Sequence, residues 1–209
     1  MRLRKVKGAM DKVNESTYTI VDPEQYKNNF NSVFGNDNEI HLEIGTGKGD
    51  FLIGMAQAFP DINFIRIEKY ESVLVRMVEK LNELELKNIK VIRYDAMDIE
   101  NLFNHEITTL YLNFSDPWPK VRHAKRRLTS EVFLAKYDHI FKGIPHIIQK
   151  TDNIGLYAYS ICSLSKYGYT INEASLDLHS EDKFNVETEY EHKFSSKGVK
   201  INFLDATKE

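Results

Sequence analysis

The stretch Glu43-Ile44-Gly45-Thr46-Gly47-Lys48-Gly49 joins a short apolar run to an amphipathic segment. Its three alternate glycines permit a tight turn and a close approach of a ligand to the backbone, and the helix expected to follow presents unpaired N–H groups. A dinucleotide fingerprint counted from Gly45 would need a glycine where Asp50 stands, and a P-loop would need Gly-Lys in place of Asp50-Phe51. The stretch therefore predicts an α/β fold whose ligand is not held through a phosphate.

The rest of the chain alternates short apolar runs with longer amphipathic segments, which is typical of a parallel sheet with crossover helices. We expect strands at residues 39–44, 62–68, 89–94, 107–114, 145–150, 169–175 and 199–204. We expect helices at residues 50–59, 72–84, 129–137 and 156–165, and a further helix at 23–34 that Asp22 caps and Pro23 begins. The pattern predicts a doubly wound, mostly parallel seven-stranded sheet of the Rossmann-like class.

Composition limits the classes of protein that fit. The 209 residues, 42% of them hydrophobic, suffice for one sizeable domain, which we place at residues 21–209 after a basic arm at 1–20. A lone cysteine, Cys162, excludes an internal disulfide and a multi-cysteine metal site, and we predict no metal. Without a signal peptide or an apolar run of roughly 18 to 20 residues, we expect a cytoplasmic protein with no membrane partner.

Acidic residues recur where the predicted strands end. Glu43, Glu68, Asp95 and Asp116 follow or close four strands, so they should rim one crevice at the carboxyl edge of the sheet. A carboxylate after the second strand suits a ribose diol, and Asp95 could accept from an adenine amino group. Four acids disfavour a pyrophosphate and favour a cationic ligand. S-adenosylmethionine carries a ribose, an adenine, an ammonium and a sulfonium and no phosphate, so we predict it as the cofactor.

The segment Ser115-Asp116-Pro117-Trp118-Pro119-Lys120 carries the only tryptophan of the chain, and five Lys or Arg fall within residues 120–127. The net charge of the chain is only -3, so this cationic cluster is local. We predict a reaction site at Asp116 beside an anion-binding surface. Two roles stay open for Trp118: stacking on a base, or lining the pocket as an apolar plug.

Six motifs together resemble the bacterial tRNA (guanine-N7-)-methyltransferase family, TrmB, from about residue 1 to 203. They lie at residues 43–49, 67–69, 115–120, 123–128, 150–153 and 188–191. The resemblance implies a class I S-adenosylmethionine-dependent methyltransferase that modifies N7 of the variable-loop guanine, position 46, of tRNA. It leaves open whether the protein is a monomer or a homodimer.

The resemblance also implies roles for individual residues. Asp116 would be the catalytic residue, and the cofactor would contact Glu43, Gly45, Gly47, Glu68, Asp95 and Asp116. The substrate would contact Lys120, Asp152, Thr188, Glu189, Tyr190 and Glu191. The RNA would contact Arg122, His123, Lys125, Arg126 and Arg127, and a mobile arm with Arg2, Arg4, Lys5 and Lys7 would order on it. Composition alone would make residues 188–191 a surface strand or loop.

Several positions depart from the family pattern. Arg66 stands where a small glycine is common, and Val121, Gln149 and Ile154 replace residues of other types. Lys7-Gly8-Ala9 replaces a Pro-Trp-Ala sequence, which removes any anchoring of the arm by tryptophan. Two alternatives remain: a methyltransferase for a small molecule, which leaves the basic run unexplained, and a non-catalytic RNA-binding protein on the same fold.

Overall fold

The computed structural model describes residues 6–45 and 47–209, and its centre is a seven-stranded sheet in the order β3-β2-β1-β4-β5-β7-β6. The strands are β1 Ile40–Ile44, β2 Asn63–Glu68, β3 Ile89–Arg93, β4 Ile107–Asn113, β5 Phe141–Thr151, β6 Thr170–Ser175 and β7 Asn202–Thr207. β1 to β5 pair in parallel, whereas β7 pairs antiparallel with both β5 and β6. The predicted doubly wound, mostly parallel sheet is confirmed.

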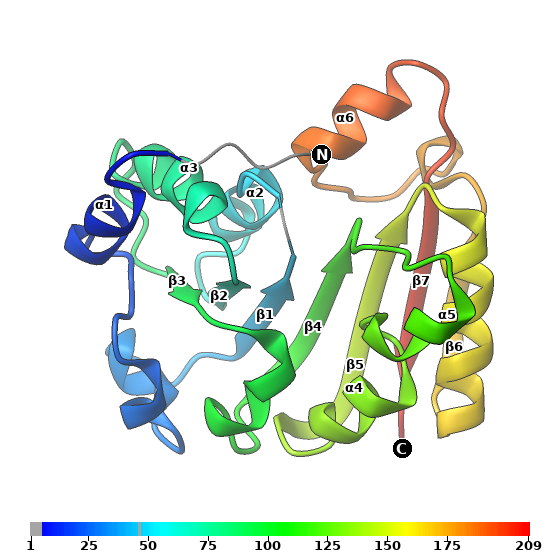
Figure 1. Ribbon diagram of the computed structural model, residues 1–209, viewed down its shortest axis with the longest axis horizontal. Helices are drawn as coiled ribbons and strands as arrows, with labels where there is room; N and C mark the ends of the chain where they lie inside the picture. The colour runs from blue at the N-terminus through cyan, green and yellow to red at the C-terminus, as the bar shows by residue number, and fades with distance from the viewer. Residues whose placement is uncertain (1–5, 46) are drawn as a thin grey trace.

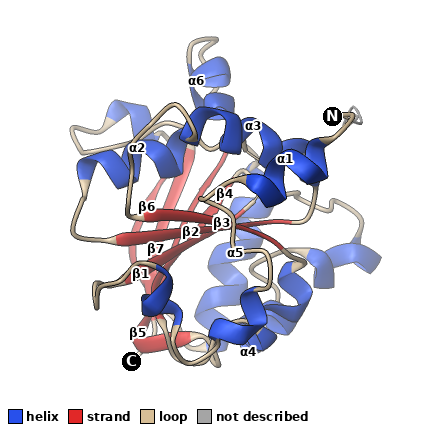
Figure 2. Cartoon of the chain, turned by 90° about the vertical axis from the view of Figure 1, so that its left-hand side faces the viewer, coloured by secondary structure: helices blue, strands red, loops and turns tan. Residues whose placement is uncertain are grey.

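Helices cover both faces of this sheet (Figure 2). α1 Ala9–Glu15, α2 Asp50–Ala58 and α3 Glu71–Leu81 lie on one face, and α4 Glu131–Tyr137 and α5 Ile154–Tyr167 lie on the other. Apolar side chains alternate along the strands, so that Ile65 and Ile67 of β2 join the core under α4 and α5 while Phe64 joins the core under α2 and α3. The strand order reverses between β1 and β4, which creates a crevice at their carboxyl ends.

Short elements complete the chain. α6 Glu189–Ser195 lies over the edge toward which the arrowheads of β1, β4 and β5 point (Figure 1). The described residues also form five 3-10 helices: η1 Pro23–Tyr26, η2 Phe30–Val33, η3 Ala96–Asn101, η4 Val121–Arg126 and η5 Leu178–Ser180. No helix in the described part of the chain combines the length and the apolar character needed to cross a bilayer.

The single helix expected at residues 23–34 is wrong, because the segment forms two separate 3-10 turns and the Asp22 side chain caps neither. Asn28 between them has a left-handed φ of 71°. The Glu106 carboxylate accepts hydrogen bonds from the backbone N–H groups of Asn28 and Phe30, at 3.1 and 2.8 Å. These hydrogen bonds pair the backbone N–H groups of Asn28 and Phe30 with a side chain distant in the sequence, where the expected helix is broken. The Phe30 side chain is fully buried.

The last strand was expected at residues 199–204 but runs from Asn202 to Thr207, because its pairing with β5 and β6 continues to Thr207. The start of β5 likewise extends to Phe141, which pairs with Ile107 of β4. Long-range pairing therefore sets these strand ends.

The N-terminal segment from Ala9 onward packs against the sheet domain. Ala9 and Val13 of α1 are buried beside α3, and Lys12 Nζ lies 3.0 Å from Glu79 Oε1. Thr19 forms a parallel bridge with Val91 of β3. Lys7 is exposed, whereas Arg2, Arg4 and Lys5 lie outside the described residues. A domain boundary at residue 20 stays a prediction.

Candidate active site

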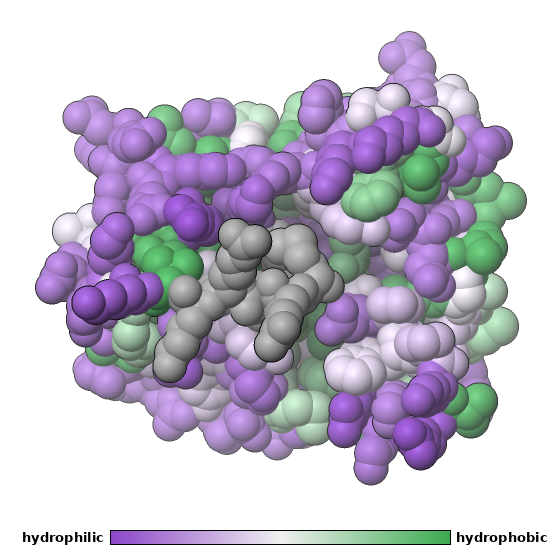
Figure 3. Space-filling view, turned by 45° about the horizontal axis from the view of Figure 1, so that its top comes forward, coloured by the Kyte–Doolittle hydropathy of each residue, from purple (hydrophilic) through white to green (hydrophobic). Residues whose placement is uncertain are grey.

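A pocket opens at the carboxyl ends of β1, β2, β3 and β4, where the strand order reverses. Gly45, Glu68, Asp95 and Asp116, four residues predicted from the sequence, line it. Its apolar lining comes from Ile44, Ile67, Ala96, Leu128 and Phe133. The face seen when this edge of the molecule is brought forward is mostly hydrophilic, with scattered apolar side chains (Figure 3). A ligand with an apolar ring and several polar groups suits such a lining.

The glycine loop leads from β1 into α2. Gly49 precedes Asp50, the first residue of α2, with a left-handed φ of 94°. A Cβ at Gly49 would lie 2.5 Å from Met77 Cγ, so this position requires glycine for conformation and for space. The loop thereby brings α2 close against α3.

Glu68 closes β2 and has one carboxylate oxygen free. Its Oε1 accepts a hydrogen bond from Tyr70 N at 2.9 Å, while its buried Oε2 has no hydrogen-bond partner among the described residues. The buried hydroxyl of Ser115, another residue that lines the pocket, also lacks a partner there. Burial raises the pKa of Glu68 to about 7. Two unpaired oxygens beside one pocket fit a ligand that carries hydroxyl or amino groups.

Asp95 is held by its own neighbours. Its Oδ1 accepts from Met97 N at 3.1 Å at the start of η3, and Lys69 Nζ lies 2.5 Å from its Oδ2. Burial acts to raise its pKa, but the hydrogen bonds from Lys69 and Met97 outweigh burial, so the pKa of Asp95 lies below its ordinary value. Asp95 therefore presents a charged, oriented acceptor to the pocket.

Asp116 lies on a constrained loop after β4. Phe114 and Trp118, two residues before and after it, have left-handed φ values of 50° and 41°, which side chains other than glycine rarely adopt. Arg127 holds this loop, because its Nε donates to Pro117 O and its Nη2 to Trp118 O, each at 3.0 Å. The Asp116 side chain is exposed at the end of the pocket. The loop thus fixes where this carboxylate lies.

The basic run meets the same pocket at Arg126. Arg122, Lys125 and Arg126 of η4 are exposed, as is Lys120 before it. The Arg126 guanidinium lies 4.9 Å from the centre of the Trp118 ring. Arg127 differs from them, because it is half-buried and its guanidinium lies over the Tyr159 ring at 4.2 Å. The structure places Arg127 as a support of the Asp116 loop.

Trp118 lies between the pocket and the basic run. It lines the pocket, and its ring meets the half-buried His123 ring edge-on at 5.8 Å between centroids. This position agrees with lining the pocket, one of the two roles left open by the sequence. Stacking on a base stays a prediction.

The segment at residues 188–191 begins a helix, and the surface strand or loop expected from composition is wrong. Thr188 Oγ1 accepts from Glu191 N at 2.9 Å, and Glu191 Oε2 accepts from Thr188 N at 3.2 Å, which is a capping box. The Glu191 side chain is completely buried. Thr188 and Glu191 therefore hold the start of α6, whereas Glu189 and Tyr190 are exposed.

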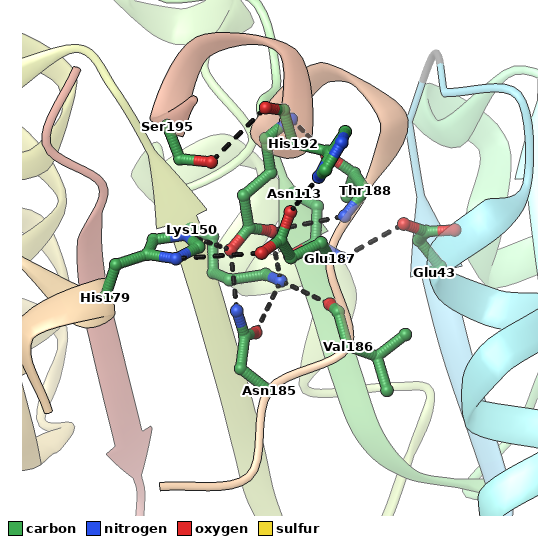
Figure 4. Close-up of polar contacts among 11 residues, drawn as sticks. Glu43, Asn113, Lys150, His179, Asn185, Val186, Glu187, Thr188, His192 and Ser195 are labelled. Carbon is green, nitrogen blue, oxygen red and sulfur yellow. Dashed lines mark hydrogen bonds and ion pairs between the residues drawn. The ribbon is translucent and has the colours of Figure 1, made fainter. Parts of the chain in front are cut away.

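Lys150, which the sequence analysis placed in a motif without giving it a role, anchors this segment to β5. Its buried Nζ donates to Glu191 Oε2 at 2.6 Å, to Asn185 Oδ1 at 3.0 Å and to Val186 O at 2.8 Å. His179 Nε2 lies 3.1 Å from the other Glu191 oxygen. Figure 4 shows Lys150 among His179, Asn185 and Val186. A lysine at the end of a buried strand was the available signal, because a buried ammonium needs a counter-charge.

Other predicted substrate residues come together beside Asp116. Tyr190 Oη donates to Asp152 Oδ2 at 2.9 Å, and the Tyr190 ring lies 5.0 Å from the ring of Phe114. Burial and the hydrogen bond to Asp152 raise the pKa of Tyr190 to about 12. Glu189 pairs with Lys48 of the glycine loop. Tyr190 of α6 thus contacts the residues that directly follow β4 and β5, and Phe114 is two residues from Asp116.

Glu43 lies apart from the other strand-end acids. It is buried, and both of its carboxylate oxygens have partners: Arg66 Nη1 donates to Oε2 at 2.8 Å and Asn113 Nδ2 to Oε1 at 3.0 Å. Arg66 Nη2 also donates to Gly45 O at 2.5 Å and to Gly47 O at 2.9 Å. The sequence singled out Arg66 as a departure without giving it a role.

Across residues 6–45 and 47–209, no group of three or more His, Cys, Asp and Glu side chains is arranged to hold a metal ion.

Comparison with known proteins identifies relatives of this chain. A family model described as "Putative methyltransferase" matches residues 37–204. The tRNA (guanine-N(7)-)-methyltransferase of Bacillus cytotoxicus is 50% identical over 99% of this chain and 96% of its own, and that of Bacillus licheniformis is 47% identical over 99% and 98%.

Solved structures agree on the fold. An antibiotic-related methyltransferase superposes with a TM-score of 0.66 at 18% identity, over 92% of this chain and 97% of its own. A SAM-dependent methyltransferase from Aquifex aeolicus superposes with a TM-score of 0.58 at 15% identity, over 95% and 96%. The family is shown by the two Bacillus relatives, which are 50% and 47% identical over nearly the full length, and by the family model. The chain belongs to the tRNA (guanine-N(7)-)-methyltransferase family.

Proposed function

We propose that this protein transfers a methyl group from S-adenosylmethionine to N7 of a guanine in tRNA, the variable-loop guanine at position 46. One observation carries the proposal: the exposed carboxylate of Asp116 lines one pocket together with Glu68, Asp95 and the exposed Arg126 of the basic run. The names of the Bacillus relatives supply the substrate. A tRNA substrate would place the protein in the cytoplasm.

The reaction needs alignment more than proton transfer. Guanine N7 carries a lone pair and no proton, so no general base is needed to create the nucleophile. When bound, S-adenosylmethionine supplies an electrophilic methyl group on its sulfonium. Holding N7 in line with that group can contribute up to about 7 to 11 kcal/mol in ideal cases. The constrained loop around Asp116 provides such fixed geometry.

Asp116 has two tasks in this proposal. Its carboxylate accepts hydrogen bonds from the N–H groups of the guanine Watson-Crick edge, which orients the base. It also stabilises the positive charge that the purine ring gains as N7 forms its new bond. Phe114, two residues before Asp116, packs against Tyr190, which Asp152 holds, so this aromatic pair lies next to the loop that would meet the base.

The cofactor half of the pocket fits S-adenosylmethionine by its chemistry. The unpaired Glu68 Oε2 can accept from a ribose hydroxyl, and the charged Asp95 can accept from the adenine amino group. The apolar lining, including Ile67 and Phe133, suits the faces of an adenine.

The basic run would bind the RNA backbone. Lys120, Arg122, Lys125 and Arg126 are exposed within ten residues of Asp116, and Arg126 lines its pocket, so they are candidates to reach phosphates next to the target base. Each phosphate that they neutralise should steepen the dependence of the binding constant on salt by about one unit. Methylation of the polymer should therefore weaken as ionic strength rises, whereas a small-molecule methyltransferase would be insensitive to it.

The test incubates the protein with methyl-labelled S-adenosylmethionine and tRNA that lacks N7-methylguanine, and maps the product by cleavage at alkylated guanine. We expect label at a single guanine of the variable loop. Label on another atom, or only on a small molecule, would replace the proposal with another methyltransferase activity. Binding of tRNA without any transfer would favour the non-catalytic alternative.

A further inference from the structure

Arg66 is an unusual residue for its position. It belongs to β2, lies inside the sheet domain with only 1% of its surface exposed, and is the largest fully buried side chain of the described residues. A guanidinium is always charged in proteins, and burying it costs free energy unless its N–H groups are paired. The partners of Arg66 therefore show what this charge does.

Its partners are parts of the glycine loop and of the strand before it. In the parallel pairing of β1 and β2, Arg66 stands opposite Glu43, so both side chains lie on the same face of the sheet. One terminal nitrogen donates to Glu43, and the other donates to the carbonyl oxygens of Gly45 and Gly47. A single planar group thus joins a carboxylate to two carbonyl groups of the glycine loop.

Both carboxylate oxygens of Glu43 already accept hydrogen bonds within the protein. Arg66 takes one oxygen, Asn113 takes the other, and the side chain is 4% exposed. Glu68, by contrast, retains an unpaired oxygen in a residue that lines the pocket. The two acids at the ends of β1 and β2 are therefore in different states, although the sequence assigned both to the cofactor.

We propose that Arg66 is a positioning residue of the cofactor site, and that Glu43 influences the cofactor through Arg66 and not by direct contact. Glu43 and Asn113 fix the guanidinium, and the guanidinium fixes the carbonyl groups of Gly45 and Gly47. Loop order is then obtained before the cofactor binds, which reduces the entropy lost on binding. The inference rests on the proposed use of S-adenosylmethionine in this pocket.

The experiment measures binding of S-adenosylhomocysteine, the demethylated product, to the full chain by calorimetry, so that no turnover is needed. The variants are Arg66→Met, Glu43→Gln and the double variant, with Arg93→Met as the matched control on the neighbouring strand β3, where the arginine is exposed. We expect each single variant to bind the product at least about tenfold more weakly. The double variant should bind S-adenosylhomocysteine no more weakly than the single variant with the lower affinity. The control should bind it with the affinity of the wild type.

Direct contact between Glu43 and the cofactor predicts a different pattern. Arg66→Met would then leave affinity unchanged or increase it by freeing the carboxylate, whereas Glu43→Gln would reduce it in either background. That pattern overturns the proposal. Wild-type protein that binds no S-adenosylhomocysteine would instead overturn the proposed function, so the two failures are distinguishable.

Loss of the buried charge could unfold the single variants, and thermal unfolding checks each one. The double variant removes both charges and so leaves no unpaired ion in the core. Arg66→Lys keeps one donor group, and we expect it to recover part of the lost affinity. Wild-type affinity in a folded double variant would contradict the role of the pair. The dissociation constant for tRNA should stay within about twofold of the wild-type value in every folded variant. A general loss of structure would instead weaken tRNA binding as well.

Discussion

Two buried cations, Arg66 and Lys150, support the two halves of the site in different ways. Arg66 reaches across to the neighbouring strand and holds the backbone of the glycine loop, next to the cofactor pocket. Lys150 holds a segment far along the chain, through the buried Glu191 of α6 and through Asn185 and Val186. The cofactor half is thus fixed by adjacent strands, and the substrate half by the excursion between β6 and β7. We therefore expect that a substitution in one half weakens binding of the cofactor or of the tRNA, but not of both.

Asp116 lines the cofactor pocket and is two residues from Phe114, which contacts Tyr190 of the substrate half, and its loss should have the largest effect. Asp116→Ala removes the charge that orients and stabilises the methylated base, so we expect turnover to fall on the order of 10² to 10³-fold. Because the side chain is exposed, the midpoint of thermal unfolding should change little. Single-turnover methylation of tRNA measures the loss, and wild-type turnover would contradict the assigned role.

Lys150→Met tests the substrate half. Removing the ammonium leaves Glu191 buried without its cation, which costs about 3 to 5 kcal/mol of unfolding free energy. In protein that remains folded, we expect the KM for tRNA to rise as α6 loses its position, while affinity for S-adenosylhomocysteine is retained. Lys166→Met, at an exposed position near the end of α5, is the control. Equal losses of both affinities would show that the halves are not separable.

The pH dependence of cofactor binding tests the other half. The pKa of Glu68 is about 7 in the folded protein, so roughly one tenth of the carboxyl is ionised at pH 6 and nine tenths at pH 8. If the ionised form accepts from the ribose, affinity for S-adenosylhomocysteine should rise about tenfold between these values. Calorimetry with Glu68→Gln should give weaker binding with a flat profile. A wild-type profile that falls as the pH rises would contradict the assignment.

The raised pKa of Glu68 also makes the free energy of unfolding depend on pH. Folded protein holds the Glu68 proton more tightly than unfolded protein, because the folded pKa lies above the ordinary value of 4.5. The contribution of this group to the free energy of unfolding therefore falls as the pH rises from about 4.5 to about 7. Glu68→Gln should reduce this part of the pH dependence, as urea unfolding at several pH values can measure.

The smallest expected effects separate two adjacent arginines. Arg126→Gln should weaken tRNA binding a few-fold and lower the salt slope by about one unit, because this exposed side chain is free to meet a phosphate. Arg127→Gln should lower kcat with an unchanged salt slope, because its guanidinium holds Pro117 O and Trp118 O. Filter binding at several salt concentrations distinguishes them. An equal reduction in slope for both would show that Arg127 also contacts the RNA.

The sequence predicts which acidic residues meet at the carboxyl ends of β2, β3 and β4, because parallel strands carry their functional residues at one edge. Glu68, Asp95 and Asp116 indeed line one pocket. It does not predict the orientation of Glu43, since that depends on Arg66 from the next strand and on Asn113 from β4. Side-chain partners of buried charges arise from tertiary packing, which periodicity does not encode.

The start of α6 could have been predicted. Thr188 followed by Glu191 at three residues is a capping-box pattern, which marks the beginning of a helix. The broken helix at residues 23–34 could not, because its interruption depends on Glu106, a residue distant in the chain. Local sequence signals therefore suffice to predict the start of α6, whereas the break in the segment 23–34 is seen only in the folded chain.

In the proposed reaction, N7 of the variable-loop guanine is the methyl acceptor. The most direct measurement supplies methyl-labelled S-adenosylmethionine and two tRNAs, one with guanine at position 46 and one with 7-deazaguanine there, in which carbon replaces the nucleophilic nitrogen. We predict about one methyl group per molecule of the first tRNA and none on the second, with similar binding of both. Equal labelling of the two tRNAs would contradict the account.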